Sequence, residues 1–366
     1  MKIDGVHYRS IWLSDNGWSV RIFDQRQLPW RVEIAELTSV ETAARAIKEM
    51  WTRGAPLIGA TAAYGLCLGL RVDPSDSALE SNYNALLETR PTAVNLRWAL
   101  DRMKAAAKPH QGARRVAAAY QCAAAICDED VDANRAIGEH GVQLIDALAE
   151  ANPGRTLNIL THCNAGWLAT VDYGTALAPI YLAHDRGIPV HVWVDETRPR
   201  NQGASLTAFE LAQHGVPHTV IADNAGGRLM QQRKVDLCIV GTDRVARNGD
   251  VCNKVGTYLK ALAANDNGVP FYIGLPLSTF DPSVASGADI PIEERSAEEV
   301  TTIHGRDKDG NLAAVKITDS PAANPAFDVT PARLVTGYIT ESGVTTTCDR
   351  FVQARKSVSS GRSLSE

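Results

Sequence analysis

The chain has 366 residues, of which 45% are hydrophobic, so it can bury a full core, and its length favours two domains over one. Its 37 basic and 42 acidic residues give a net charge of −5, which excludes the overall positive field typical of proteins that bind nucleic acid or anionic membranes. We predict no membrane-spanning helix, and the opening MKIDGVHYRSIWL lacks the apolar stretch of a signal peptide, so we expect a cytoplasmic protein.

The first part of the chain predicts strands followed by helices. Over residues 1–35, apolar and polar residues alternate as in SVRIFDQRQLP, which indicates short strands. SVETAARAIKEMWTRG begins with a capping serine and predicts a helix that ends at Gly54, and RRVAAAYQCAAAICDED and NRAIGEHGVQLIDALAEANPG predict further helical segments. We therefore predict an N-terminal domain, residues 1–150, that consists of a small β element and a helical bundle.

After Pro153 the pattern changes to apolar runs of strand length that alternate with helical stretches. The runs are TLNILTH, PVHVWVDE, PHTVIAD, VDLCIVGTD and VPFYIGLP. Continuous apolar strands separated by amphipathic helices indicate a parallel sheet covered on both faces. The predicted fold class is therefore α/β, with a Rossmann-like sheet domain over residues 151–355. Within it, IPIEERSAEEV and HGRDKDGN predict a lid or an edge extension, and residues 356–366 are expected to form a loose tail.

Polar residues follow each predicted strand, where ligands bind in parallel α/β sheets. The first strand is followed by His162 and Cys163. The second is followed by Arg198 and Arg200 before a helix that opens at Gly203. Arginines and free amides at a helix N-terminus suit a phosphate, and a solvated loop is the alternative. Because no GxGxxG follows the first strand and no GxxxxGK[ST] occurs, dinucleotide and NTP sites are disfavoured.

The connection GTDRVARNGDVCNKVGTYLKALAA supplies a candidate acid. Asp243 directly follows a buried strand, and burial can raise the pKa of a carboxyl so that it donates a proton near neutral pH. The alternative is an aspartate that only caps the turn. Asn253 and Lys254 are predicted to open the next helix, where a lysine is unfavourable for the helix dipole unless an anion lies nearby.

The first half of the chain adds further cations. In TRGAPLIGATAAYG, Arg53 stands beside a predicted helix start, which suits a phosphate as well as it suits an ordinary junction between helices. In ETRPTAVNLRWAL, Arg90 and Arg97 face either the same site or solvent. The seven cysteines show neither a disulfide framework nor the spacing of a zinc site. By residue type alone, Cys163 would be a small core residue.

Several long motifs, in the same order along most of the chain, resemble the 5-methylthioribose-1-phosphate isomerase family. They are DQRQLP, TRGAPLIGATAAYG, RPTAVNLRWAL, ILTHCNAG, VDETRPRNQGASLTAFEL, IVGTDRVARNGDVCNKVGTY, PFYIGLP and IPIEER. The resemblance implies a homodimer without cofactor or metal, in which a small N-terminal domain packs on a Rossmann-like domain. It also implies that Cys163 and Asp243 are the catalytic pair and that the sugar phosphate is held by Arg53, Gly54, Ala55, Arg90, Gln202, Asn253 and Lys254.

The reaction that the resemblance implies is an aldose–ketose isomerisation in methionine salvage, from 5-methylthioribose 1-phosphate to 5-methylthioribulose 1-phosphate. Because the anomeric carbon carries a phosphate ester, the ring oxygen must be protonated before the ring opens, a role that suits a neutral Asp243. Hydrogen then moves from C2 to C1, as a proton with Cys163 as base or acid, or as a hydride with the thiol assisting electrostatically.

Two alternatives remain open at the level of sequence. The first is an isomerase of the same kind that acts on 5-deoxyribose 1-phosphate or ribose 1,5-bisphosphate, with the same catalytic pair and a different pocket for C5. The second is a sugar-phosphate-binding protein without activity, like the regulatory subunits of eukaryotic translation initiation factor two-B. That second alternative predicts that the thiol and the carboxylate are dispensable.

Overall fold

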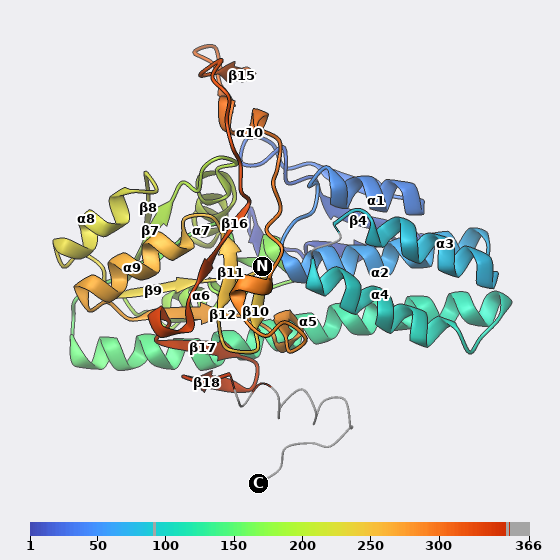
Figure 1. The fold of residues 1–366 in the computed structure, drawn as a ribbon, viewed down its shortest axis with the longest axis horizontal. Coiled ribbons are helices and arrows are strands. Elements are labelled where there is room, and N and C mark those ends of the chain that lie inside the picture. Colours follow the sequence, from blue (N-terminus) through green and yellow to red (C-terminus); the bar gives the residue numbers. More distant parts are fainter. Residues whose placement is uncertain (91–92, 349–350, 352–366) are drawn as a thin grey trace, which may run out of the picture.

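The protein is described from a computed structural model that covers residues 1–90, 93–348 and 351; the predicted tail, residues 356–366, lies outside the described residues. Figure 1 shows a helical half, coloured blue to green, beside a half in which helices surround a central sheet. The α/β fold class predicted from the sequence is confirmed. The domain boundary at residues 150 and 151 stays a prediction.

Short antiparallel strands form the start of the chain, as the alternating pattern predicts. Val20 and Ile22 of β4 are fully buried, whereas Arg21 between them is not. One hairpin pairs β1 (Lys2–Ile3) with β2 (Val6–His7), and a three-stranded sheet contains β3 (Ile11–Leu13), β4 (Val20–Phe23) and β5 (Ile34–Leu37).

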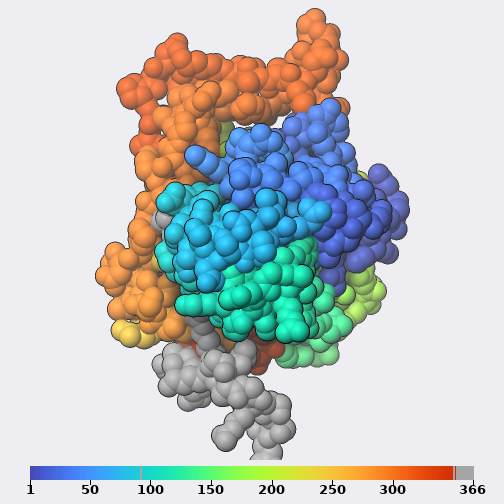
Figure 2. All heavy atoms as spheres, turned by 90° about the vertical axis from the view of Figure 1, so that its right-hand side faces the viewer, coloured from blue at the N-terminus to red at the C-terminus, as the bar shows by residue number. Residues whose placement is uncertain are grey.

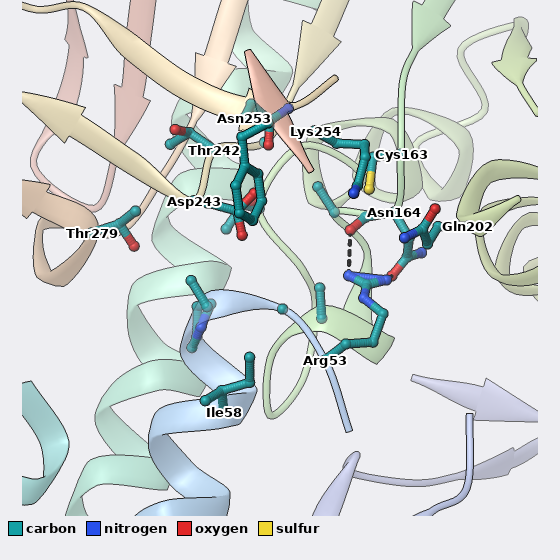
Figure 3. A pocket seen from close by; sticks show the side chains of 18 of the residues that line it. Arg53, Ile58, Cys163, Asn164, Gln202, Thr242, Asp243, Asn253, Lys254 and Thr279 are labelled. Carbon is teal, nitrogen blue, oxygen red and sulfur yellow. Dashed lines mark hydrogen bonds between the residues drawn. The ribbon is translucent and has the colours of Figure 1, made fainter. Parts of the chain in front are cut away.

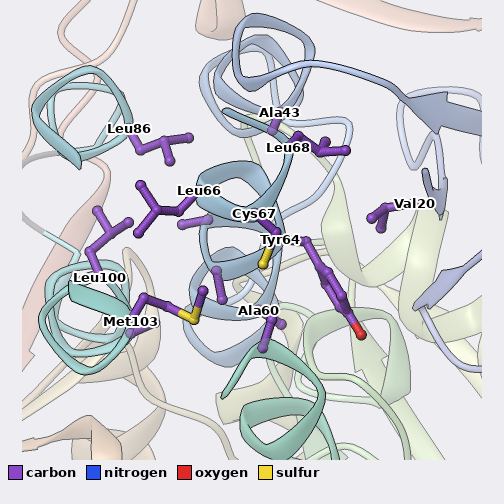
Figure 4. Packing of buried hydrophobic residues seen from close by; sticks show 14 of the residues in the cluster. Val20, Ala43, Ala60, Tyr64, Leu66, Cys67, Leu68, Leu86, Leu100 and Met103 are labelled. Carbon is purple, nitrogen blue, oxygen red and sulfur yellow. The ribbon is translucent and has the colours of Figure 1, made fainter. Parts of the chain in front are cut away.

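Five helices follow, and α2 (Ala55–Val72) lies at their centre. Almost every side chain of α2 is buried among its neighbours, and Figure 4 shows Tyr64, Leu66 and Cys67 of this helix within that core. By length and composition α2 could span a membrane, which the sequence reading missed, but 83% of it is buried inside the protein, as expected for a core helix. The other helices are α1 (Val40–Lys48), α3 (Asp76–Leu87), α4 (Val94–Ala107) and α5 (Gly112–Ala151).

Two helix predictions differ from the structure. Helix α1 ends at Lys48 instead of Gly54, because Met50 adopts a positive φ of 60° that breaks the helix. The two helical segments predicted before residue 154 form one helix, α5, since no Gly or Pro interrupts the chain between Gly112 and Gly138. Helix α5 contributes to both cores, with Ile126 in the helical half and Ile145 against the sheet.

A seven-stranded sheet organises the second half. Its strand order is β18-β17-β12-β9-β6-β7-β8, and only β18 runs antiparallel to its neighbour. The chain moves outward from β6 through β7 to β8, then returns to β9 and moves outward the other way. The connections therefore reverse between β6 and β9, where doubly wound sheets open a crevice for ligands. The strands are β6 (Leu157–Thr161), β7 (Val190–Asp195), β8 (His218–Ile221), β9 (Leu237–Val240), β12 (Phe271–Gly274), β17 (Gly337–Thr340) and β18 (Gly343–Thr345).

Apolar side chains on both sides of the strands build two cores. Ile159 and Ile239 face a core shared with α5, α6 and α7, whereas Leu160 and Val240 face α8 and α9. This burial on both faces explains the continuous apolar runs in the sequence. The helices are α6 (Ala178–Asp185), α7 (Ala208–His214), α8 (Ala225–Gln231) and α9 (Thr257–Asn267), and a π-helical turn, Gly203–Thr207, leads into α7.

A second sheet corrects the prediction for Asn253 and Lys254. Both lie on β11 (Val251–Lys254), which pairs with β10 (Arg244–Ala246) and β16 (Phe327–Thr330), so neither opens a helix. Helix α9 begins only at Thr257, after Gly256 with a φ of 106°. The helix-dipole argument for Lys254 is therefore wrong. The fourth strand of this sheet is β13 (Phe280–Asp281).

Residues 290–326 leave the body of the protein and return to it. They include α10 (Glu298–Thr301) and a hairpin of β14 (Thr302–Arg306) and β15 (Leu312–Lys316), which projects at the top of Figure 1. In Figure 2 this orange segment forms a projecting band above the blue N-terminal part. It occupies the place at which a lid or edge extension was predicted. Short 3-10 turns complete the fold at Trp167–Ala169, Leu277–Thr279, Gly287–Asp289 and Ala332–Leu334.

Candidate active site

A pocket opens at the carboxyl ends of β6 and β9, where the strand connections reverse. It has about 770 Å³ of empty space open to solvent and is also lined by the start of α2 and the end of β11. All nine residues predicted for the site line it: Arg53, Gly54, Ala55, Arg90, Cys163, Gln202, Asp243, Asn253 and Lys254. Figure 3 shows the labelled members of this set converging from both halves of the chain.

Gly54 allows the first half of the chain to approach the second closely. Its φ is 94°, and a Cβ at this position would lie 2.3 Å from the carbonyl oxygen of Ala169. Only glycine fits such a contact and such a conformation. Gly54 also precedes the first residue of α2, with Pro56 in the first turn of the helix as predicted.

Cys163 is held in a strained conformation two residues after the end of β6. Its φ is 65°, which is uncommon for a residue with a side chain. Its N–H donates to Oγ1 of Thr197 (2.8 Å), and its carbonyl accepts from Oγ1 of Thr207 (2.7 Å). Burial raises the pKa of the Cys163 thiol, while Arg53 and Lys254 act in the opposite direction. These two cations are therefore the groups that favour a thiolate there.

Asp243 lies across the pocket, in the connection that follows β9. Its N–H donates to the carbonyl of Cys252 (3.0 Å), which fixes the backbone on β11. Burial raises the pKa of the Asp243 carboxyl, although Lys254, Arg90 and Arg53 each lower it. A carboxyl whose pKa is raised keeps its proton to a higher pH than an ordinary aspartic acid does, which suits a group that donates a proton to a substrate.

Four cations line the pocket, and they differ in how they are compensated. Arg90 pairs with Glu293 (3.0 Å), and Arg295 pairs with both Glu293 (2.9 Å) and Glu299 (2.6 Å). Arg53 and Lys254 have no carboxylate within ion-pair distance among the described residues. Burial lowers the pKa of Lys254, whereas Cys163 and Asp243 raise it. The two positive charges of Arg53 and Lys254 would balance the two negative charges of one phosphate dianion.

Two side chains that line the pocket also carry a polar atom without a partner among the described residues. Nε of Arg90 and Oε1 of Gln202 are buried and have no hydrogen-bond partner in the described part of the chain. Buried polar groups are normally paired, so an unpaired donor and an unpaired acceptor at one pocket suit a polar ligand. A sugar phosphate offers both acceptors and hydroxyl donors.

The sequence reading missed several residues that line the pocket. Asn164 accepts two hydrogen bonds from Arg53, from Nη1 to Oδ1 (2.6 Å) and from Nη2 to the carbonyl (2.7 Å). Arg295 comes from the IPIEER motif, which carried the resemblance but was given no role. Arg295 could have been predicted as a site residue, because it is a cation within a motif that the chain shares with the family. Apolar contacts come from Met50, Ile58, Pro276 and Phe327.

Three arginines considered from the sequence lie elsewhere. Arg198 donates to the carbonyl of Val300 (2.7 Å), and Arg200 pairs with Glu299 (2.8 Å). Both therefore hold the 290–326 segment and are not among the residues that line the pocket. Arg97 is exposed on α4 and is likewise absent from the lining.

A cluster behind Cys163 has the composition of a metal site but is filled by a lysine. The acidic and imidazole groups of His162, Asp195 and Asp223 lie within 4.8 Å of one another. However, Nζ of Lys260 lies 3.1 Å from Oδ2 of Asp195, and Nε2 of His162 faces the carbonyl of Val255 (2.9 Å). The ammonium group already supplies the positive charge that a cation would bring.

Together, the pocket has the parts needed for acid–base chemistry on an anionic substrate. A thiol and a carboxyl with raised pKa face a space that also holds uncompensated cations and unpaired polar atoms. Groups of this kind perform proton transfers next to a bound phosphate.

Comparison with known proteins agrees with this arrangement. Residues 51–347 match the Initiation factor 2 subunit family. A methylthioribose-1-phosphate isomerase of Acidiphilium cryptum is 65% identical over 97% of both chains, and one of Paramagnetospirillum magneticum is 65% identical over 94% of this chain and 96% of that protein.

Solved structures extend the comparison to the fold. The 5-methylthioribose 1-phosphate isomerase of Pyrococcus horikoshii is 41% identical, covers 96% of each chain and superposes with a TM-score of 0.81. Subunit delta of translation initiation factor eIF-2B from A. fulgidus is 37% identical over 95% of this chain and 100% of that one, with a TM-score of 0.78. The chain therefore belongs to the Initiation factor 2 subunit family, and within it to the methylthioribose-1-phosphate isomerases.

Proposed function

We propose that the protein is an aldose–ketose isomerase that converts 5-methylthioribose 1-phosphate to 5-methylthioribulose 1-phosphate in methionine salvage. The near full-length relatives with this activity in their names support the assignment. The structural observation that best supports the assignment is the position of Cys163 and Asp243. They follow the two central strands and line a pocket with uncompensated cations.

In the proposed mechanism, Arg53 and Lys254 bind the phosphate on C1, with Gly54, Ala55, Arg90, Gln202 and Asn253 completing the site. Asp243 starts protonated and gives its proton to the ring oxygen, so that the C1–O bond of the ring breaks. Its raised pKa is the property that this step needs.

Cys163 then serves the hydrogen transfer from C2 to C1. As a base, its thiolate would remove the proton from C2 to give an enol phosphate, and the resulting thiol would then protonate C1. The C2 hydroxyl proton would pass to the Asp243 carboxylate, which leaves the ketone at C2 and restores the acid. The positive charges of Arg53 and Lys254 favour the thiolate and would stabilise the negative charge that develops on the C2 oxygen as its proton leaves. In a hydride path, Cys163 would contribute electrostatically without exchanging a proton.

The distribution of charge favours a single phosphate on the substrate. Ribose 1,5-bisphosphate would need a second cationic cluster, but Arg90 and Arg295 are already paired with Glu293 and Glu299. Apolar side chains such as Met50, Ile58 and Phe327 line the pocket and suit a methylthio or deoxy group at C5.

The experiment is a turnover assay with 5-methylthioribose 1-phosphate, followed by NMR detection of the ketose. Cys163→Ser and Asp243→Asn should each lower kcat by about a hundredfold or more, because general acid–base groups contribute about that much. Cys122→Ser, at a half-buried thiol away from the pocket, and Asp132→Asn, on the surface, should keep wild-type activity. Run in deuterated water, the assay tests the proton path, since deuterium at C1 requires that the proton taken up by the thiol exchange with solvent, and hydride transfer cannot introduce it.

Binding without turnover of the methylthio, 5-deoxy and bisphosphate substrates would contradict the isomerase assignment. It would favour the binding role suggested by the likeness to an eIF-2B subunit.

We also propose a cytoplasmic homodimer, with the projecting hairpin as part of its interface. Leu312, Val315 and Ile317 are more than half exposed there, at 54%, 59% and 54%. A two-stranded hairpin is marginally stable unless another surface covers it. Light scattering should give twice the chain mass for the wild type and a lower mass for Val315→Lys, whereas a dimer unchanged by Val315→Lys would place the interface elsewhere.

A further inference from the structure

Glu210 has no part in the reaction proposed above, although it lies within the LTAFEL motif and contacts Asn164, which lines the pocket. It stands on α7, is 1% exposed, and lines no part of the pocket. Its Oε1 accepts from Nδ2 of Asn164 (2.8 Å) and from the N–H of Leu168 (3.0 Å). Its Oε2 accepts from the N–H of Trp167 (2.8 Å) and from the Tyr181 hydroxyl (2.7 Å).

These contacts identify Glu210 as a buried anion. Three of the four partners can only donate, so both carboxylate oxygens already serve as acceptors. Burial raises the pKa of Glu210, and the hydrogen bonds from Asn164 and Tyr181 lower it. The loop after Cys163 wraps closely around this carboxylate, because a Cβ on Gly166 would lie 1.8 Å from Oε2. A buried charge held this tightly requires compensation nearby.

Asn164 connects this anion to Arg53. The amide of Asn164 donates through Nδ2 to Glu210, and it accepts through Oδ1 from Nη1 of Arg53 (2.6 Å), a bond drawn in Figure 3. The amide dipole is thus oriented with its oxygen toward the cation and its nitrogen toward the anion. The arrangement is an ion pair with one amide group between its members.

The inserted amide has a consequence for ligand binding. Arg90 and Arg295 contact their carboxylates directly, which neutralises their charge at the pocket. Arg53 is fixed in place with its counter-charge one residue further away, so its positive charge stays available to an incoming anion. Arg53 comes from the first half of the chain and Asn164 from the second, so the same contact also sets the position of one half against the other.

We propose that Glu210 is the positioning residue of Arg53: acting through Asn164, it orients the guanidinium and provides its counter-charge. This inference rests on the proposed function, in which Arg53 binds the substrate phosphate. It predicts that substrate affinity depends on a carboxylate that the substrate never touches.

The test compares Glu210→Gln with Tyr181→Phe. Glu210→Gln removes the charge at nearly the same volume and should raise KM by about tenfold or more, as expected for a hydrogen bond to a charged group, with a smaller effect on kcat. Tyr181→Phe removes one hydrogen bond from the far oxygen of Glu210, so it should lower the melting temperature and leave KM unchanged. Asn164→Ala, which cuts the connection and keeps the carboxylate at position 210, should raise KM to a similar extent.

A double-mutant cycle with Arg53→Lys separates positioning from general destabilisation. If Glu210 acts through Arg53, the effects on KM of Glu210→Gln and Arg53→Lys will be strongly non-additive. Effects that multiply independently, or a Glu210→Gln or Asn164→Ala variant with reduced stability and unchanged KM, would overturn the proposal. Calorimetric titration with inorganic phosphate provides the same comparison without turnover. A wild type that binds phosphate but isomerises nothing would therefore refute the proposed function while still deciding the role of Glu210.

Discussion

The raised pKa of Asp243 suits a catalytic acid, but it also lowers the stability of the folded protein at neutral pH. Burial raises the pKa of its carboxyl above the ordinary value of 3.8, so the folded protein binds this proton more tightly than the unfolded chain does. The associated stability is fully present below the unfolded pKa and is lost as pH rises through the folded pKa. A catalytic group tuned in this way destabilises the fold at neutral pH.

We therefore expect Asp243→Asn, besides its loss in kcat, to be more stable than the wild type at pH 7. Its melting temperature should be higher by about 2 °C or more, and the difference should shrink as pH falls toward the ordinary value of 3.8, because the wild-type carboxyl is increasingly protonated in the unfolded chain as well. Thermal unfolding of the two proteins from pH 4 to pH 8 measures this. A variant that is less stable at pH 7 would show that Asp243 is held as a structural anion by Lys254.

For single residues, the position relative to a predicted strand indicated which ones belong to the site, but their side-chain contacts could not be predicted from the sequence. Cys163 and Asp243 were predicted because they follow apolar strands, and both line the pocket. Asn164 was overlooked although it is adjacent to Cys163, since its value depends on contacts with Arg53 and Glu210 that are distant in sequence. The choice between a phosphate site and a solvated loop stayed open for Arg198 and Arg200 for the same reason, because their partners lie about 100 residues away.

Helix α5 joins the two halves through close contacts at its glycines. A Cβ on Gly141 would lie 2.4 Å from the side chain of Pro179 on α6, and one on Gly138 would lie 2.9 Å from Leu182. These glycines let the two helices pack closely where a larger residue would separate them.

Gly141→Val should destabilise the protein by about 1 to 3 kcal/mol, because overpacking forces α5 away from α6. Ala147→Val, at an exposed position of the same helix, introduces valine without the clash and should cost about 0.5 kcal/mol through helix propensity alone. Replacing glycine with valine improves helix propensity, so any loss at Gly141 must come from packing. Urea unfolding at pH 7 compares the two variants, and a Gly141→Val protein as stable as the wild type would show that α5 and α6 separate without cost.

At the scale of elements, periodicity predicted the helices and strands that have a strong pattern. The alternation in β4 and the apolar runs of β6, β7, β9 and β12 were found in the sequence. The error at β11 has a physical cause: its short sequence VCNK acquires strand conformation by pairing with β10 and β16. Such tertiary pairing is not encoded in local propensity.

For the whole molecule, two half-buried carboxyls, Asp130 and Glu341, lie where the two halves of the chain meet. Asp130 on α5 and Glu341 between β17 and β18 line one cavity, and burial raises the pKa of each to about 7. Glu341 further raises the pKa of Asp130, and both Oε atoms of Glu341 accept from the N–H of Leu277. Stability associated with these protons is present below about pH 4 and is lost as pH rises toward 7.

Glu341→Gln should therefore make the protein more stable at pH 8, by about 1 to 3 kcal/mol, and leave its stability unchanged near pH 4. Glutamine keeps an acceptor for the N–H of Leu277. Denaturant unfolding at the two pH values measures the difference, with Glu139→Gln on the surface of α5 as the control. A gain of the same size at both pH values would argue against the titration of Glu341 as its cause.

Helix α5, which contributes to the cores of both halves, also affects how the chain folds during synthesis. Ile137, Val142 and Ile145 belong to the core that also contains side chains of β6, β7 and β9. During synthesis this apolar stripe leaves the ribosome before those strands exist to cover it. The first 150 residues released alone would expose the same stripe. We therefore expect this fragment to associate with chaperones or to aggregate, and nascent chains to bury the stripe only after β9 has emerged.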